Sequence, residues 1–261
     1  MIMSQVSSNA DILGKKVFFL HPTVVVQNRI IEELIQHEYE IYIAKNKEKL
    51  RKLLREFPDS IVFVDINEHI AETEWEIWIR GMMEAPDCKD ISVGIVTTNE
   101  NEQLKQKYLT SIKVPCGYTI VGHDLQKAIE RIVLALQEAS AKGRRKYIRA
   151  VIERGDPNIA INLSLDGVFV NGQIKDISVV GISCTFEGNP EIPKNTLLKD
   201  IQVRLQTSLL KAEGIIFGSR MESMEKIYVL LFTQRIDPEV RTKIRKYIQY
   251  NLQNKMNFKL T

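Results

Sequence analysis

The spacing of apolar residues changes near residue 141, and this change limits the chain to folds with two different parts. Before it, short apolar runs alternate with stretches in which apolar residues recur every three or four positions. After it, strand-like runs follow one another, separated by Gly, Asn and Pro. The 261 residues suffice for two ordinary domains. We therefore predict domains at 1–141 and 151–261, joined by a linker at 142–150.

The first part is predicted to be an α/β domain, because strand-like and helix-like segments alternate along it. Such alternation is typical of a parallel sheet covered on both faces. The last helix is expected to begin at the cap residue Asp124 and to end at Gly143. The predicted strands are 16–20, 40–44, 60–66, 92–98 and 117–121, and the predicted helices are 28–38, 47–57, 73–83, 101–112 and 124–143.

This order resembles the receiver domain of response regulators, but the residues that carry receiver chemistry are incomplete. Receivers hold Mg²⁺ with an acidic pair after the first strand, where this sequence has His21-Pro22. Asp65 occupies the place of the phosphorylated aspartate, and Thr97 matches the hydroxyl residue that receivers carry after the fourth strand. The lysine expected after the fifth strand is missing. A lone carboxylate does not stabilise phosphoryl transfer without its metal. We therefore expect Asp65 to have a structural role.

The second part is predicted to be a small antiparallel β-barrel or sandwich followed by one helix. The helix, over residues 237–256, begins at an Asp-Pro cap. Its apolar residues recur every four positions and form one stripe that can pack on the strands: Val240, Ile244, Ile248 and Leu252. The predicted strands are 158–167, 168–178, 181–188, 200–208, 211–220 and 226–233.

Positive charge is concentrated in the second part and at its beginning. Residues 1–140 hold 16 Lys and Arg against 21 Asp and Glu, whereas residues 141–261 hold 20 against 12. The second part is therefore suited to an anionic partner. Within residues 143–150 lie four cations: Arg144, Arg145, Lys146 and Arg149. Such a run is either a solvated linker or an anion-binding segment.

Two short motifs favour the anion-binding segment. Arg145 and Arg149 form an RxxxR motif just before the first predicted strand. Asp176, Ser178 and Gly181 form a DxSxxG motif between two later strands. An RxxxR alone is common in basic linkers. The ordered pair, placed before and within a β-barrel, resembles the PilZ family of cyclic di-GMP receptors.

The resemblance covers about residues 143–235 and implies a fold for that part. It implies a six- or seven-stranded antiparallel β-barrel with a C-terminal helix. The whole chain closely resembles a two-domain spirochaetal member of the family, in which a PilZN3-type domain stands in front of the barrel. A second PilZ-like β-barrel often occupies that position in the family. Such a barrel is therefore the alternative to the receiver-like α/β domain over residues 1–141.

The resemblance also implies a role for each motif residue. Arg145 and Arg149 would wrap the ligand, because a guanidinium bonds phosphate or guanine O6 and N7 and stacks on a purine. Asp176 would accept hydrogen bonds from guanine N1–H and N2–H₂. Ser178 would supply a hydroxyl, and Gly181 would let the backbone turn or approach the ligand. The ordinary alternatives are a turn held by Asp-x-Ser and a β-bulge at Gly181.

Arg144 and Lys146 are secondary candidates for ligand contacts, with a solvated position as the alternative for each. Members of the family bind either one ligand molecule or an intercalated pair. The number depends partly on the residue just before RxxxR, which is Arg144 in this chain. We expect one molecule.

The residue patterns point to a receptor and not to an enzyme. The sequence contains no Ser-His-Asp set, no glycine-rich nucleotide loop and no CxxC pair among Cys88, Cys116 and Cys184. We therefore predict no catalytic residue, no metal site and no cofactor besides the ligand. No apolar run reaches about 18 residues, and no secretory signal precedes the first domain. These features predict a cytoplasmic protein without a membrane partner.

Because RxxxR lies in the predicted linker, capture of the ligand is expected to fold the linker onto the barrel and to reorient the two domains. The change would alter downstream regulation of gene expression, motility or virulence through one of two partners. One is a protein bound to the N-terminal domain. The alternative is DNA or RNA bound by the basic second part, where residues 241–259 place several cations along one helix. Without a recognition motif, such binding would be weakly sequence-specific and sensitive to salt.

Overall fold

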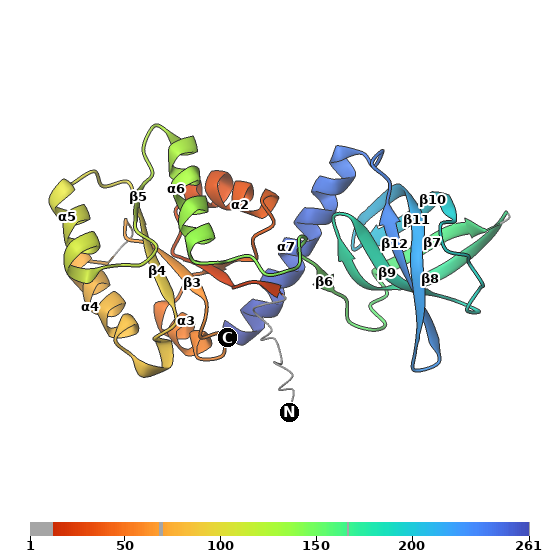
Figure 1. The fold of residues 1–261 in the computed structure, drawn as a ribbon, viewed down its shortest axis with the longest axis horizontal. Helices are drawn as coiled ribbons and strands as arrows, with labels where there is room; N and C mark the ends of the chain where they lie inside the picture. The colour runs from red at the N-terminus through yellow and green to blue at the C-terminus, as the bar shows by residue number, and fades with distance from the viewer. Residues whose placement is uncertain (1–12, 68–69, 166, 261) are drawn as a thin grey trace, which may run out of the picture. The chain divides into compact units, whose positions relative to one another are not determined.

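The computed structural model describes residues 13–67, 70–165 and 167–260, and the chain divides into two compact units. One unit, called here the α/β unit, contains Met1–Lys146 together with Gln253–Thr261. The other, called the barrel unit, contains Tyr147–Leu252. Figure 1 shows the elements of both units along the chain.

The α/β unit is built on a five-stranded parallel sheet with the strand order β2-β1-β3-β4-β5 (Figure 1). Its strands are β1 (Val17–Leu20), β2 (Ile41–Ala44), β3 (Ile61–Asp65), β4 (Ser92–Thr97) and β5 (Tyr118–Ile120). Every residue of β1 and β3 is buried, as expected for strands covered on both faces. The α/β prediction is confirmed. The alternative of a second PilZ-like barrel in this part is wrong, because parallel strands joined by crossover helices do not form an antiparallel barrel.

Helices connect the strands and cover both faces of the sheet. The face that carries Phe19, Ile41 and Phe63 belongs to one apolar cluster with residues of η1, α2 and α6. Figure 1 shows α3 and α4 on the opposite side of the sheet. The helical elements are η1 (Val26–Ile31), α2 (Glu32–Gln36), α3 (Lys47–Leu54), α4 (Glu72–Met83), η2 (Pro86–Cys88), α5 (Glu102–Gln106), η3 (Lys107–Ile112) and α6 (Leu125–Glu138).

The two ends of α6 differ in how well the sequence predicts them. Asp124 caps the helix as predicted, since its carboxylate accepts a hydrogen bond from the Lys127 N–H at 3.0 Å. The predicted end at Gly143 is wrong, because α6 ends at Glu138. Ser140 has a φ of 52° and turns the chain out of the helix. Sequence patterns miss this because serine at a left-handed position is uncommon.

Asp65, at the end of β3, is part of a buried hydrogen-bond network. Its carboxylate accepts from the Thr23 N–H at 2.9 Å and from the Asn67 N–H at 3.2 Å. The Asn67 side chain also donates to Asp65, and it accepts from the Thr97 hydroxyl at 2.8 Å. Burial raises the pKa of Asp65, and the hydrogen bonds from Thr23 and Asn67 oppose this shift. The network confirms the structural role expected for Asp65.

The barrel unit contains six antiparallel strands that close on themselves. The order is β8-β7-β10-β11-β12-β9, and a pairing of β9 with β8 completes the ring. The strands are β7 (Ile159–Leu165), β8 (Val168–Ser178), β9 (Gly181–Phe186), β10 (Leu197–Leu205), β11 (Ser208–Glu222) and β12 (Glu225–Phe232). A short strand, β6 (Ala150–Val151), pairs with β8 outside this ring. The predicted antiparallel barrel is confirmed, whereas β6 is too short to be recognised from its pattern.

Helix α7 (Pro238–Leu260) begins in the barrel unit and ends in the α/β unit. Its predicted stripe packs on the barrel core, where Ile244 and Ile248 are buried. In the α/β unit, the Gln253 side chain pairs with both backbone groups of Ile43 in the edge strand β2, at 2.8 and 3.0 Å. This covers part of a sheet edge that would otherwise be unpaired. Among the residues that the structure describes, no helix is both long and apolar enough to span a bilayer.

Candidate ligand site on the barrel

Strand β6 brings Arg149 next to the DxSxxG motif. Ala150 pairs with Ile177 and Val151 with Asp176 in the antiparallel β6–β8 ladder. Arg149 directly precedes β6, and its Nη1 atom lies 3.2 Å from the Asp176 Oδ1 atom. The two side chains are 44% and 23% exposed. The last residue of RxxxR and the first residue of DxSxxG therefore form an ion pair that a ligand in solution can reach.

The DxSxxG residues lie on the side of their strands that faces away from the barrel core, where Asp176 is partly exposed and Ser178 and Gly181 are buried. Five residues, one on each of five strands, pair in a row, and all of them belong to the buried core. They are Ala150 on β6, Ile177 on β8, Ile182 on β9, Leu230 on β12 and Ile216 on β11. Neighbours along a strand point to opposite faces. The residues adjacent to this core row, including Asp176, Ser178 and Gly181, therefore point outward.

A β-bulge lies directly before Asp176. The β8–β9 register shifts between Ile174 and Asp176, so that Lys175 is the extra residue. Bulges change the direction of neighbouring side chains and recur beside functional sites. The Lys175 ammonium lies 2.9 Å from Glu225, whose other carboxylate oxygen lies 2.6 Å from Arg154. The hydrogen bond from Lys175 lowers the pKa of Glu225, so this nearby carboxylate is already neutralised by cations.

Ser178 closes the two-residue turn between β8 and β9. Its hydroxyl donates to the Gly181 carbonyl at 3.2 Å and accepts from the Val180 N–H at 3.4 Å. The side chain is buried. This is the turn held by its own side chain that the sequence offers as an alternative. A ligand contact of Ser178 stays a prediction.

Gly181 is required where β9 approaches β12. A Cβ atom at this position would lie 2.3 Å from the Leu230 carbonyl oxygen, closer than any real contact. Gly181 is not in the left-handed region, so no turn demands glycine there. The bulge lies at Lys175 and not at Gly181. The close approach of the two strands explains Gly181 sterically, and its ligand contact stays a prediction.

The boundary between the two units falls inside the RxxxR motif. Arg144, Arg145 and Lys146 are exposed and belong to the α/β unit, whereas Arg149 belongs to the barrel unit. The structure thus brings Arg149 together with Asp176, Ser178 and Gly181. The ligand contacts of Arg144, Arg145 and Lys146 stay predictions.

The cysteines are buried and carry no disulfide. Burial raises the pKa of Cys116 to about 11. Cys184, in the core beneath the motif, has its pKa raised by burial first and by the charge of Asp176 second. Within the described ranges, no three His, Cys, Asp or Glu side chains lie close enough together to hold a metal ion.

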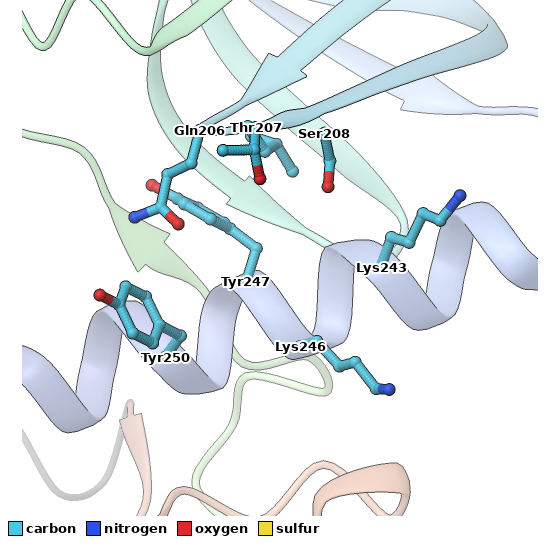
Figure 2. Close-up of a pocket in the computed structure, with 8 residues that line it drawn as sticks. Gln206, Thr207, Ser208, Lys243, Lys246, Tyr247 and Tyr250 are labelled. Atoms are coloured by element: carbon cyan, nitrogen blue, oxygen red, sulfur yellow. The ribbon is translucent and has the colours of Figure 1, made fainter.

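A second feature of the barrel unit is a hollow of about 240 Å³ between α7 and the β10–β11 turn. Figure 2 shows Tyr247 directed from α7 toward the turn at Gln206, with Lys243 on the same side of the helix. Burial raises the pKa of Tyr247 to about 12. Tyr250, next to it, is 52% exposed. Cations and aromatic faces are the groups that contact single-stranded nucleic acids, and the DNA or RNA partner stays a prediction.

Comparison with known proteins gives matches only among solved structures. No protein-family model and no curated protein matches the sequence. The PilZ domain of YcgR from Escherichia coli, solved with c-di-GMP, is 16% identical with a TM-score of 0.37, and the match covers 44% of this chain and 96% of that one. The MrkH–c-di-GMP complex from K. pneumonia is 18% identical with a TM-score of 0.39, over 46% of this chain and 57% of that one.

A third match is the Borreliella burgdorferi PlzA protein in complex with c-di-GMP. It is 16% identical with a TM-score of 0.29, and the match covers 48% of this chain and 47% of that one. The chain thus matches about half the length of the MrkH and PlzA chains. All three structures were solved with c-di-GMP, and the YcgR structure is that of a PilZ domain. Similarity at this level does not establish membership of the family, and the close resemblance to the spirochaetal protein PlzA is not confirmed.

Proposed function

We propose that this protein is a cyclic di-GMP receptor that binds its ligand on the outside of the barrel unit. The observation that carries the proposal is the 3.2 Å contact between Arg149 and Asp176. The contact joins two motifs that lie 27 residues apart in the sequence, and it offers a cation and an anion side by side. A guanine nucleotide presents complementary groups, namely phosphate oxygens for the guanidinium and N1–H and N2–H₂ for the carboxylate.

The ion pair can change partners at little cost. Both side chains are partly exposed, and a pair in contact with water contributes at most about 1 kcal/mol. The Arg149 guanidinium can therefore donate to a phosphate or to guanine, while Asp176 accepts hydrogen bonds from the edge of the base. In this proposal Arg145 grips the same ligand from the linker. Ser178 and Gly181 line the ligand site, and Arg144 and Lys146 add contacts with the phosphates. One ligand molecule binds at this site.

Calorimetric titration of the full chain with cyclic di-GMP and, as the control, cyclic di-AMP tests the proposal. We expect binding of cyclic di-GMP to be about a hundredfold tighter or more, because adenine lacks the N1–H and N2–H₂ donors and would leave Asp176 unpaired. The two ligands carry the same phosphates, so charge alone predicts equal affinities. Absence of binding, or equal binding of the two, would contradict the proposal.

The receptor in this proposal acts as a switch between two arrangements of its parts. We take 1–141 and 151–261 as the domains and 142–150 as the linker that folds onto the barrel when the phosphates neutralise its cations. A ligand shifts such an equilibrium only as far as it prefers one state. Energy transfer between dyes on the two domains should change at saturating cyclic di-GMP. An unchanged signal in a protein that binds the ligand would refute the switch and leave the receptor proposal intact.

A further inference from the structure

A hollow of about 530 Å³ lies in the α/β unit beside the end of the edge strand β2. Sites for small molecules typically have volumes of about 300–1,000 Å³, so the hollow is large enough for one small metabolite. Its walls come from β2 and the residues after it, from η1, and from the last turns of α7, all of which belong to the α/β unit. The lining residues are Gln27, Ile43, Lys45, Asn46, Lys49, Gln253 and Asn257.

The hollow is a local concentration of positive charge in an acidic part of the chain. Lys45 and Lys49 line it, both lysines are exposed, and none of the seven lining residues is acidic. The surrounding residues 1–140 hold 16 Lys and Arg against 21 Asp and Glu. A hollow lined by one sign of charge raises the local concentration of ligands of the opposite sign. The lining therefore favours an anion.

The two asparagines of the lining offer donors to a ligand. The Asn46 Oδ1 atom accepts a hydrogen bond from the Lys49 N–H at 2.9 Å. The Asn257 Oδ1 atom accepts one from the Gln253 side chain at 2.8 Å. Because both amide oxygens already have a donor, the N–H₂ groups of Asn46 and Asn257 are the atoms that a ligand can use. Two amide donors thus accompany the two ammonium groups.

Gln27 offers the complementary group, an acceptor. Its Nε2 atom donates to the Pro22 carbonyl at 2.7 Å, which leaves its Oε1 atom to accept from a ligand. Gln253 has no such capacity, because its amide makes two hydrogen bonds with Ile43 and one with Asn257. The hollow therefore presents four donor groups for an anion and one oxygen for a hydroxyl.

We infer that this hollow binds a phosphate monoester with a hydroxyl-bearing body, such as a sugar phosphate or a nucleoside monophosphate. A phosphate monoester carries about −1.5 to −2 charges at pH 7 and three acceptor oxygens, which suit two ammonium and two amide donors. Lysine binds phosphate as a point charge, and a hydroxyl of the body would donate to the Gln27 oxygen. The inference does not rest on the proposed function, because Arg149 and the DxSxxG motif belong to the barrel unit.

Titration of the ¹⁵N-labelled full chain with ribose 5-phosphate tests the inference, since this compound is also the polar part of a nucleoside 5′-monophosphate. We expect saturable shifts of the backbone amide resonances of Lys45, Asn46 and Lys49, and of the side-chain N–H₂ resonances of Asn46 and Asn257. Ribose lacks the phosphate and should bind at least about tenfold more weakly. Inorganic phosphate lacks the hydroxyl-bearing body and should bind about threefold more weakly or worse.

Lys45→Gln and Lys49→Gln should each raise the Kd for ribose 5-phosphate about fivefold or more, because each removes a charge-assisted contact. Lys52→Gln is the matched control, since Lys52 is an exposed lysine of the same helix segment that does not line the hollow. It should change the Kd less than about twofold. Thermal unfolding of each variant checks that the α/β unit is folded.

The outcomes separate this inference from the proposed function. Absence of saturable shifts, or equal weakening by Lys52→Gln, would overturn the site, because the second result would indicate general attraction of anions to exposed lysines. Inorganic phosphate that binds as tightly as ribose 5-phosphate would overturn the hydroxyl-bearing body. Arg149→Ala should bind ribose 5-phosphate with unchanged affinity, and Lys45→Gln should bind cyclic di-GMP as the unaltered protein does. If one substitution abolishes both kinds of binding in a folded protein, the independence of this site is wrong.

Discussion

Arg149→Ala is expected to weaken cyclic di-GMP binding by about a hundredfold or more, and Arg145→Ala by a similar factor. Hydrogen bonds to charged groups contribute about 1.5–3 kcal/mol each, so loss of a two-bond contact from one guanidinium corresponds to this change in Kd. The two residues are expected to act on the same ligand. Calorimetric titration of each variant measures the effect.

The fold should survive both substitutions, so the loss of binding can be assigned to the missing contacts with the ligand. Arg149 is 44% exposed and its pairing with Asp176 is open to water, which limits its contribution to stability to less than about 1 kcal/mol. Arg154→Ala is the matched control. Arg154 is an exposed arginine of the same unit that pairs with a carboxylate, Glu225, but lies outside the motif. If Arg154→Ala loses binding equally, or if Arg149→Ala and Arg145→Ala retain it, the proposed ligand contacts of Arg145 and Arg149 are excluded.

The strands and helices of both units follow from local patterns because those patterns are long and regular. The six barrel strands and the stripe on α7 each repeat their period several times, and burial then selects the same face that the sequence indicates. Element ends depend on single residues. Serine at position 140 takes a conformation that glycine usually takes, so α6 ends before Gly143. The last turns of α7 belong to the α/β unit, where Gln253 pairs with Ile43, and this pairing has no local signal in the sequence.

The site divides in the same way into local and non-local parts. RxxxR and DxSxxG can be read from the sequence because each motif is contiguous. The contact of Arg149 with Asp176 depends on the two-residue strand β6 and on the bulge at Lys175, neither of which leaves a periodic pattern. The pairing of Gly181 with Leu231 depends on strand register in the same way. Register between strands distant in sequence is set by the closed barrel as a whole.

Gly181→Ala is expected to lower the free energy of unfolding by about 2–3 kcal/mol. The added methyl group would lie 2.3 Å from the Leu230 carbonyl oxygen and about 3.1 Å from the Leu231 side chain. The side chain can move, but the carbonyl belongs to the β9–β12 pairing that helps to close the barrel. The strands must separate to accept the methyl group, which weakens their hydrogen bonds. Denaturant unfolding followed by circular dichroism measures the change.

Gly218→Ala is the matched control, because Gly218 is also a glycine that pairs with β12, opposite Val229. A Cβ atom there would have no atom within 4 Å, and its φ is not in the left-handed region. Stability should therefore change by less than about 0.5 kcal/mol, with alanine favoured slightly by its lower entropy in the unfolded chain. If Gly181→Ala is as stable as Gly218→Ala but binds cyclic di-GMP less well, the close approach of β9 and β12 is not the reason for glycine. The requirement for glycine would then come from the ligand alone, as the DxSxxG motif predicts.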